Sequence, residues 1–177
     1  MAQIAATREK IPSIKISFNP NTDPRTKYNQ TKLAVLIEGR AQPELVPHIL
    51  HMIAVVPQDW RFLFIGSNKS VTSVGRSVPI KYQQAAGKLD LMVMNGGVEN
   101  AGVGTGAMGQ GSSGEALPWD ISDKEGVWRM LTDMRFYDAV MPGVEWMLKF
   151  ESDSILCANS DQSLNDWLDY DWAAAPR

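Results

Sequence analysis

The sequence predicts an α/β fold of three layers, with a mainly parallel sheet of about four strands between flanking helices. Four short apolar runs have the length and composition of buried strands. Stretches with helical spacing of apolar residues separate them, and strands that alternate with helices form parallel sheets. The chain of 177 residues is long enough for one domain with a substantial core. The predicted strands cover residues 33–37, 61–65, 89–94 and 146–150.

Composition and charge limit the classes of function. The net charge is −3 and the pI is near 5.4, so we expect no nucleic-acid partner bound through a basic surface. The single cysteine, Cys157, cannot form an internal disulfide, and its apolar neighbours predict that it is buried. No segment approaches the roughly 18 apolar residues that cross a bilayer, and the N-terminus lacks the apolar core of a signal peptide. We therefore expect a soluble chain without a membrane span, cytoplasmic by default.

Two segments differ from the rest of the predicted domain, which we place at residues 31–177. Residues 1–30 are polar and contain three prolines, which predicts a tail, although a short alternating apolar stretch there would also suit an edge strand. Residues 95–117 hold eight of the 14 glycines, which predicts a flexible insertion. Gly104-Thr-Gly-Ala-Met-Gly109 matches a nucleotide-binding glycine motif, but it lacks the preceding strand and following helix that would hold its amides around a phosphate.

The helices are predicted from apolar residues three and four positions apart. A first helix follows Pro43, and short helical pieces lie between Ser67 and Gly87, which suits a left-handed C-terminal cap. Ser122-Asp-Lys-Glu125 predicts a capping box that opens one longer helix, and Ser160 predicts the start of a last one. We expect most of the six tryptophans in the core. The expected buried positions on the last two helices are Val127, Met130, Leu131, Met134, Tyr137, Leu164, Trp167 and Leu168, with Trp128 and Phe136 off this stripe.

An acidic pair, Glu151 and Asp153, follows the fourth predicted strand directly. Open α/β sheets bind ligands at the carboxyl ends of their strands, and carboxylates there suit a hard divalent cation together with the phosphates of a substrate. The alternative is an ordinary solvated strand end. His48 and His51 share a helix face without a third ligand, so we expect solvated or packed histidines and no metal site there. The acidic residues Asp166, Asp169 and Asp171 predict a solvated face.

Several segments resemble a family known mainly from filamentous fungi, catalogued as a domain of unknown function and grouped with nucleotide-sugar glycosyltransferases of the type A fold. The resemblance runs from about Lys32 to Pro176, apart from the glycine-rich segment. It rests on Leu33-Ala-Val-Leu-Ile-Glu-Gly-Arg40, Gly87-Lys-Leu-Asp-Leu91, Asp153-Ser-Ile-Leu-Cys-Ala-Asn-Ser160 and Ser163-Leu-Asn-Asp-Trp-Leu-Asp-Tyr-Asp171.

The resemblance implies a site, a cofactor and a ligand. Type A glycosyltransferases carry a D-x-D motif after the fourth strand, where manganese or magnesium holds the diphosphate of a nucleoside-diphosphate sugar. Glu151 and Asp153 fall on the first and last positions of that motif, with Glu replacing the usual Asp, so Asp153 is the better metal contact. The usual strand order 3-2-1-4 would place the loop after the first strand opposite this pair. There the resemblance implies nucleotide contacts by Glu38, Gly39 and Arg40, whereas a local ion pair between Glu38 and Arg40 is the alternative.

Two classes of function stay open. The first is a metal-dependent transferase that moves a sugar from a nucleoside diphosphate, with its catalytic residue unknown. The second is a truncated, catalytically inactive nucleotide-binding or interaction remnant, because only one helix is expected after the fourth strand, where such enzymes usually place acceptor-binding elements. A nucleotidyltransferase is a third reading, although the glycine-rich activating loop of those enzymes after the first strand is missing.

Overall fold

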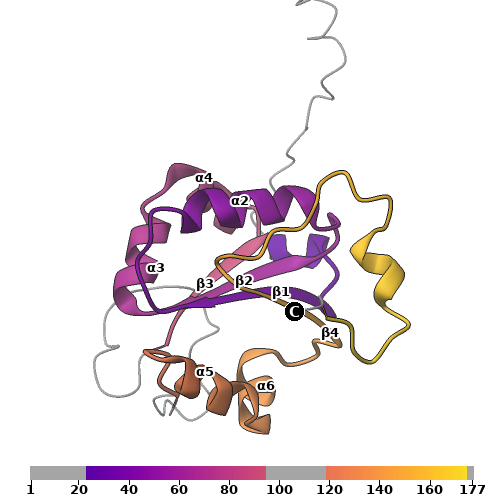
Figure 1. Cartoon of the computed structure of the whole chain (residues 1–177). Helices are drawn as coiled ribbons and strands as arrows, with labels where there is room; N and C mark the ends of the chain where they lie inside the picture. The colour runs from indigo at the N-terminus through magenta and orange to yellow at the C-terminus, as the bar shows by residue number, and fades with distance from the viewer. Residues whose placement is uncertain (1–22, 95–118, 175–177) are drawn as a thin grey trace, which may run out of the picture.

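The sheet has four parallel strands, as the sequence predicts. The computed structural model describes residues 23–94 and 119–174. The strands are β1 (Lys32–Glu38), β2 (Arg61–Gly66), β3 (Leu89–Val93) and β4 (Trp146–Phe150), in the order β3-β2-β1-β4. All three neighbouring pairs are parallel, and β1 pairs with β2 and β4 (Figure 1). The predicted α/β class and the strand order 3-2-1-4 are therefore confirmed.

Helices cover both faces of the sheet, which makes three layers (Figure 1). One face carries the helices that connect the first three strands, and the other carries the pair that precedes β4. The predicted glycine cap is present, because Gly87 follows α4 with a left-handed φ of 74°. The first group comprises α2 (Leu45–Val55), α3 (Asn68–Gly75) and α4 (Val78–Ala85), the second α5 (Lys124–Leu131) and α6 (Met134–Val140), and two short 3-10 helices are η1 (Pro24–Lys27) and η2 (Leu164–Trp167).

The apolar strands β1 and β2 divide the core into two clusters, one on each face. Alternate residues point to opposite faces, so Ala34, Leu36, Phe62 and Phe64 pack against α2, α3 and α4. Leu33, Val35, Leu63 and Ile65 pack against the second pair of helices, together with Trp119, Ile121, Met130 and Phe136. Burial on both faces explains why these strands are continuous apolar runs.

The helical region before β4 differs from the prediction of one helix opened by Ser122. Asp123 is the N-cap residue and accepts a hydrogen bond from the Gly126 amide at 2.6 Å, so the predicted capping box is wrong by one position. Asp133 then caps a second helix and interrupts the first. Because of this break, α6 buries a different face from the one predicted for a continuous helix. Met134, expected in the core, is exposed, and Phe136, expected off the stripe, is buried.

Beyond Phe150 the chain is less buried than its apolar residues suggest. β4 forms one edge of the sheet of described residues, so it is only partly buried, contrary to the expectation for an apolar run. The following segment is irregular, and Cys157 is exposed, which corrects the expected burial. The last helix is a 3-10 turn capped by Ser163 in a capping box with Asp166, and Ser160 does not cap it. Only Trp60 and Trp119 of the six tryptophans are buried.

Hydrogen bonds of polar groups connect several segments of the chain at the amino ends of the strands. Lys88 is 3% exposed, and its ammonium donates to the carbonyls of Gln58 at 2.9 Å and Trp60 at 2.6 Å. Asn165 of η2 accepts from the Trp60 indole at 2.8 Å and from Lys32 at 3.2 Å. Residues 23–30, the described part of the predicted tail, lie at this end too, where the Asn29 amide donates to the Asp59 carbonyl. The rest of that tail and the predicted 95–117 insertion lie outside the described residues.

Candidate functional site

The carboxyl ends of β1 and β4 meet where the direction of strand addition reverses. β2 and β3 follow β1 on one side, whereas β4 pairs with its other side, with Leu36 opposite Phe150. In open α/β sheets a ligand crevice lies at such a switch point, outside the carboxyl ends of the strands. Glu38, which ends β1, and Glu151, which follows β4, are therefore neighbours in the fold although they are far apart in sequence. The structure brings together the two segments that the sequence analysis assigned to one site.

Glu38 is the centre of this contact. Its carboxylate accepts three hydrogen bonds from Arg40, from the amide at 2.9 Å, Nε at 2.9 Å and Nη2 at 2.8 Å. It also accepts one from the Ser152 hydroxyl at 3.2 Å, which ties the loop after β1 to the segment after β4. Burial of this carboxyl would raise its pKa, but the Arg40 bonds outweigh burial and the pKa is lowered. The ion pair that the sequence analysis kept as an alternative is present.

Gly39 is fixed by close packing. A Cβ atom at this position would lie 2.9 Å from the Ile121 carbonyl oxygen, closer than side chains tolerate. The Ser67 hydroxyl donates to the Gly39 carbonyl at 2.6 Å and holds the same turn from the other side. The glycine therefore lets the loop after β1 pass between α3 and the segment that leads to α5.

Of the two predicted metal contacts, Glu151 is already paired and Asp153 is exposed. The Glu151 carboxylate accepts a hydrogen bond from Lys149 at 2.7 Å, and this contact lowers its pKa. The negative charge of Glu38 raises the pKa of Glu151, so the two carboxylates interact electrostatically. Within the described parts of the chain, no three His, Cys, Asp or Glu side chains form a metal-binding group. A divalent cation would therefore need the oxygens of a bound ligand to complete its coordination.

Two histidines of α2 contact backbone carbonyls of the segment after β4, a role that the sequence analysis missed. His48 Nε2 lies 3.0 Å from the Glu151 carbonyl oxygen, and its ring packs against Phe150. His51 Nε2 lies 3.2 Å from the Leu156 carbonyl oxygen. A carbonyl oxygen can only accept a hydrogen bond, so Nε2 is the donor in each case. The spacing of these two residues on one face of α2 was the available signal, but the sequence did not reveal what lies opposite them.

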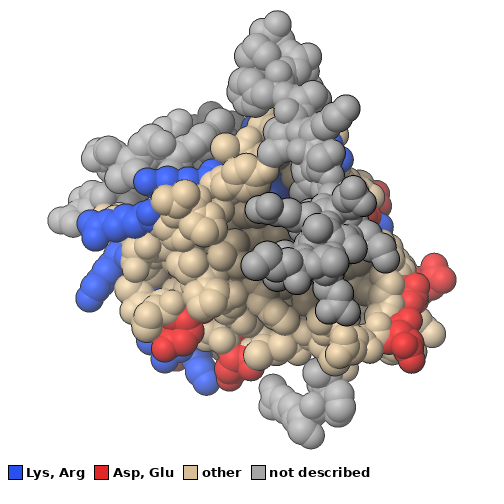
Figure 2. Space-filling model, turned by 90° about the horizontal axis from the view of Figure 1, so that it is seen from above, with Lys and Arg blue, Asp and Glu red and all other residues tan. Residues whose placement is uncertain are grey.

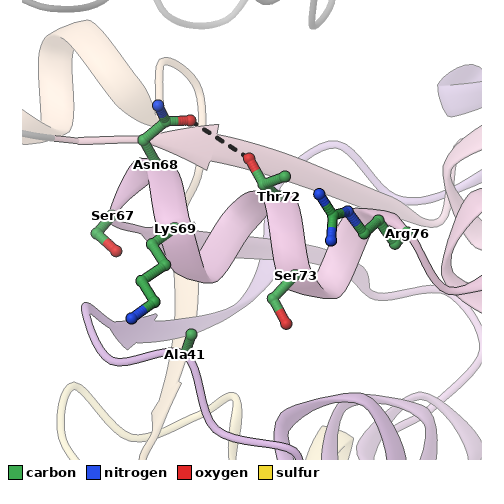
Figure 3. Close-up of a pocket in the computed structure, with 7 residues that line it drawn as sticks. All are labelled: Ala41, Ser67, Asn68, Lys69, Thr72, Ser73 and Arg76. Atoms are coloured by element: carbon green, nitrogen blue, oxygen red, sulfur yellow. Dashed lines mark hydrogen bonds between the residues drawn. The ribbon is translucent and has the colours of Figure 1, made fainter.

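A hollow of about 610 Å³ lies beside α3 (Figure 3). Its lining combines hydroxyl groups with two cations, and no acidic side chain lines it. Lys69 of α3 and Arg76, the residue that caps the end of this helix, are both exposed, whereas Val71 and Val74 are buried. The lining residues are Ala41, Ser67, Asn68, Lys69, Thr72, Ser73 and Arg76.

Fold and site together define an α/β protein with a polar cluster at the switch point of a parallel sheet. The model of a family described as "Protein of unknown function (DUF5672)" matches residues 116–177, which include α5, α6, β4 and the segment after it. No curated protein and no solved structure matches the chain. Among the helices of residues 23–94 and 119–174, none combines the length and apolar character needed to span a bilayer.

Proposed function

We propose that this chain binds a nucleoside-diphosphate sugar with manganese or magnesium at the carboxyl ends of β1 and β4, in the manner of a metal-dependent glycosyltransferase. The observation that carries the proposal is the hydrogen bond from Ser152 to Glu38, which joins the two strand ends at the switch point. The resemblance to type A glycosyltransferases supports the same location. The loop of Glu38, Gly39 and Arg40 would then contact the nucleoside, and the segment after β4 would face the diphosphate.

Each residue of the site has a role in this proposal. Asp153, exposed and two positions after the strand, is the first carboxylate for the cation, and Glu151 joins it when Lys149 releases it. Arg40 is 74% exposed at its side chain and keeps a guanidinium beside the loop, where it suits a phosphate. A bound cation would supply charge neutralisation for a departing diphosphate. His48 and His51 would keep the segment in position.

Calorimetric titration of UDP and GDP, with and without manganese, tests this site. We expect manganese-dependent binding to the wild-type protein and a loss of at least about tenfold in affinity for Asp153→Ala, equivalent to about 1.4 kcal/mol. Asp161→Ala is the matched control, because Asp161 is an exposed aspartate of the same segment. Absence of heat and of any thermal shift with both nucleotides, from a protein with a native circular dichroism spectrum, would contradict the proposal.

A second candidate function is a catalytically inactive nucleotide-binding or interaction remnant of the same fold. The pairing of Glu38 with Arg40 and of Glu151 with Lys149 favours it, because both carboxylates are already neutralised by side chains of the protein. This alternative predicts nucleotide binding without release of sugar from UDP-sugars or GDP-sugars. The transferase predicts both, so an assay for free nucleoside diphosphate in the presence of manganese distinguishes them.

A further inference from the structure

The C-terminal part of the described chain forms an acidic surface with exposed aromatic rings. Residues 151–172 contain six acidic residues and no lysine or arginine. Trp172 is 84% exposed and Tyr170 58%, and the rings of Trp167 and Tyr170 lie 5.9 Å apart. Large aromatic side chains so exposed are typical of interfaces, where Trp and Tyr supply much of the binding energy. We call Asp166, Trp167, Asp169, Tyr170, Asp171 and Trp172 the acidic aromatic surface.

The helices α3 and α4 form a surface of opposite character. Residues 61–88 contain no aspartate or glutamate. The outer faces of the two helices expose three cations together with Val78, which is 76% exposed, and Tyr82, which is 51% exposed. The hollow between Lys69 and Arg76 opens on this surface and has room for an aromatic ring (Figure 3). We call Lys69, Arg76, Val78, Lys81 and Tyr82 the basic surface.

The helices α3 and η2, which carry parts of the two surfaces, lie at opposite ends of the strands, because α3 follows the carboxyl end of β2 and η2 contacts the amino ends of the strands. In Figure 1 α3 lies at the left of the sheet, whereas η2 lies at the right. In the space-filling view, basic side chains project at the left, and acidic side chains lie at the right edge and also at the lower left (Figure 2). The part of the acidic aromatic surface on η2 is therefore remote from the part of the basic surface on α3 of the same chain.

We propose that the acidic aromatic surface docks on the basic surface of a second copy of this chain. Opposite charge on the two surfaces selects this partner and steers the encounter. Trp172 would insert into the hollow, where Lys69 and Arg76 offer cation–π contacts. Val78 and Tyr82 supply apolar area for the other rings. The two patches differ, so the contact is heterologous and a dimer keeps one free surface of each kind, which allows open chains to grow with concentration.

Sedimentation velocity across a range of concentrations tests the proposal. We expect the weight-average sedimentation coefficient to rise with concentration in about 50 mM salt and to fall toward the monomer value in about 0.5 M salt, because screening weakens exposed charge pairs. The variant Lys69→Glu/Arg76→Glu/Lys81→Glu and the variant Asp166→Lys/Asp169→Lys/Asp171→Lys should each sediment as monomers. An equimolar mixture of the two variants should associate again, because each now offers surfaces complementary to the other.

Controls separate this contact from general charge effects and from nucleotide binding. Lys124→Glu/Arg129→Glu reverses two exposed cations of α5 outside both surfaces and should associate like the wild type. Trp172→Ser should weaken association without changing the net charge. Asp153→Ala and chelation of metal should leave it unchanged, so failure of the nucleotide proposal does not affect this one. A monomer at every concentration in low salt, or association that survives both charge reversals, would overturn the proposal.

Discussion

Lys88 shows how the fold changes the chemistry of a single residue. Its ammonium is enclosed at the amino end of β3, with the Tyr28 and Phe62 rings 5.0 and 5.4 Å away. Burial disfavours the charged form of Lys88 and lowers its pKa to about 8, although its ammonium donates hydrogen bonds to two carbonyl oxygens. The folded protein therefore releases this proton at a lower pH than the unfolded chain does.

This shift predicts stability that increases with pH. Between pH 8 and 10.5 the unfolded chain keeps the Lys88 proton and the folded protein loses it, so the free energy of unfolding rises, by up to about 3 kcal/mol over the full interval. Lys88→Met should lack this contribution, whereas Lys81→Met, at an exposed position, should keep it. Urea unfolding of the three proteins at steps from about pH 7.5 to pH 10 measures the difference. Parallel profiles for wild type and Lys88→Met would contradict the lowered pKa.

Single residues were predicted only where their partners are close in sequence. The bond between Glu38 and Arg40 could be anticipated, because the two residues lie in one short loop. The contacts of His48, His51 and Ser152 could not, because each of them depends on how the segment after β4 crosses the sheet. The roles of Asp153 in cation binding and of Gly39 in nucleotide binding stay predictions.

At the scale of elements, Asp133 decides how the chain reaches β4. Its carboxylate caps α6 by accepting from the Arg135 amide at 3.0 Å, and it accepts from the Trp119 indole at 3.1 Å. The Arg135 guanidinium bonds the same carboxylate and lowers its pKa strongly. The two helices therefore turn at Thr132, which puts Phe136 and Trp119 in edge-to-face contact.

We expect Asp133→Ala to destabilise the protein by about 1 to 2 kcal/mol, because it removes a helix cap and leaves the Trp119 donor unpaired. Asp133→Asn keeps an oxygen for both contacts and should lose less. Asp138→Ala, at an exposed position of α6, is the control and should stay within about 0.5 kcal/mol of the wild type. The measurement is the midpoint and slope of urea unfolding. Equal losses for Ala and Asn would contradict the capping role.

Helix ends were predicted less well than helix existence for a physical reason. Ser122, Asp123, Ser160 and Ser163 can all cap a helix, so local chemistry leaves the choice open. In the first case Ser122 donates to the Asp120 carboxylate and Asp123 accepts from the helix amide, and in the second the contacts of η2 with the amino end of the sheet accompany the cap at Ser163. The exposure of β4 and Cys157 was missed for a related reason, because an apolar run does not reveal whether its strand is central or at an edge.

At the scale of the whole molecule, Asn165 connects the C-terminal segment to the sheet. Its side chain connects η2 to the amino ends of two strands, because Trp60 and Lys32 donate to its oxygen and its amide donates to Asp59 at 3.4 Å. Leu164 and Leu168 on either side pack against the core cluster of α2 and α3. The segment after β4 is thereby fastened at its far end as well as by His48 and His51.

We expect Asn165→Ala to lower the free energy of unfolding by about 1 to 2 kcal/mol, because it leaves the indole of the buried Trp60 without its acceptor, whereas Lys32 keeps its bond to Asp59. Unfolding should stay a single transition, with fluorescence and circular dichroism changing together, because η2 packs against the same core as the sheet. Gln162→Ala, at an exposed neighbouring position, is the control. A loss confined to one probe would show that η2 unfolds independently of the sheet.

The overall architecture was predictable because it depends on the strongest signals in the chain. The apolar runs of β1, β2 and β3, together with the helices between them, define a parallel sheet with few alternatives. The position of β4 beside β1 came from the resemblance to a known fold, and the structure confirms it. The sequence has no comparable pattern that predicts which aromatic side chains are exposed, and the acidic aromatic surface depends on that exposure.

The edge position of β4 also has a consequence for synthesis on the ribosome. Leu33 of β1 pairs with Arg61 of β2 after a single helix has emerged, but its partner on the other side, Met147, emerges only after β3 and the helices α3, α4, α5 and α6. Until then one edge of β1 exposes its backbone donors and acceptors, which can pair with other extended chains. Loop closure over such a separation is also slow. The nascent chain is therefore most prone to misassociation, and most in need of a chaperone, just before β4 leaves the exit tunnel.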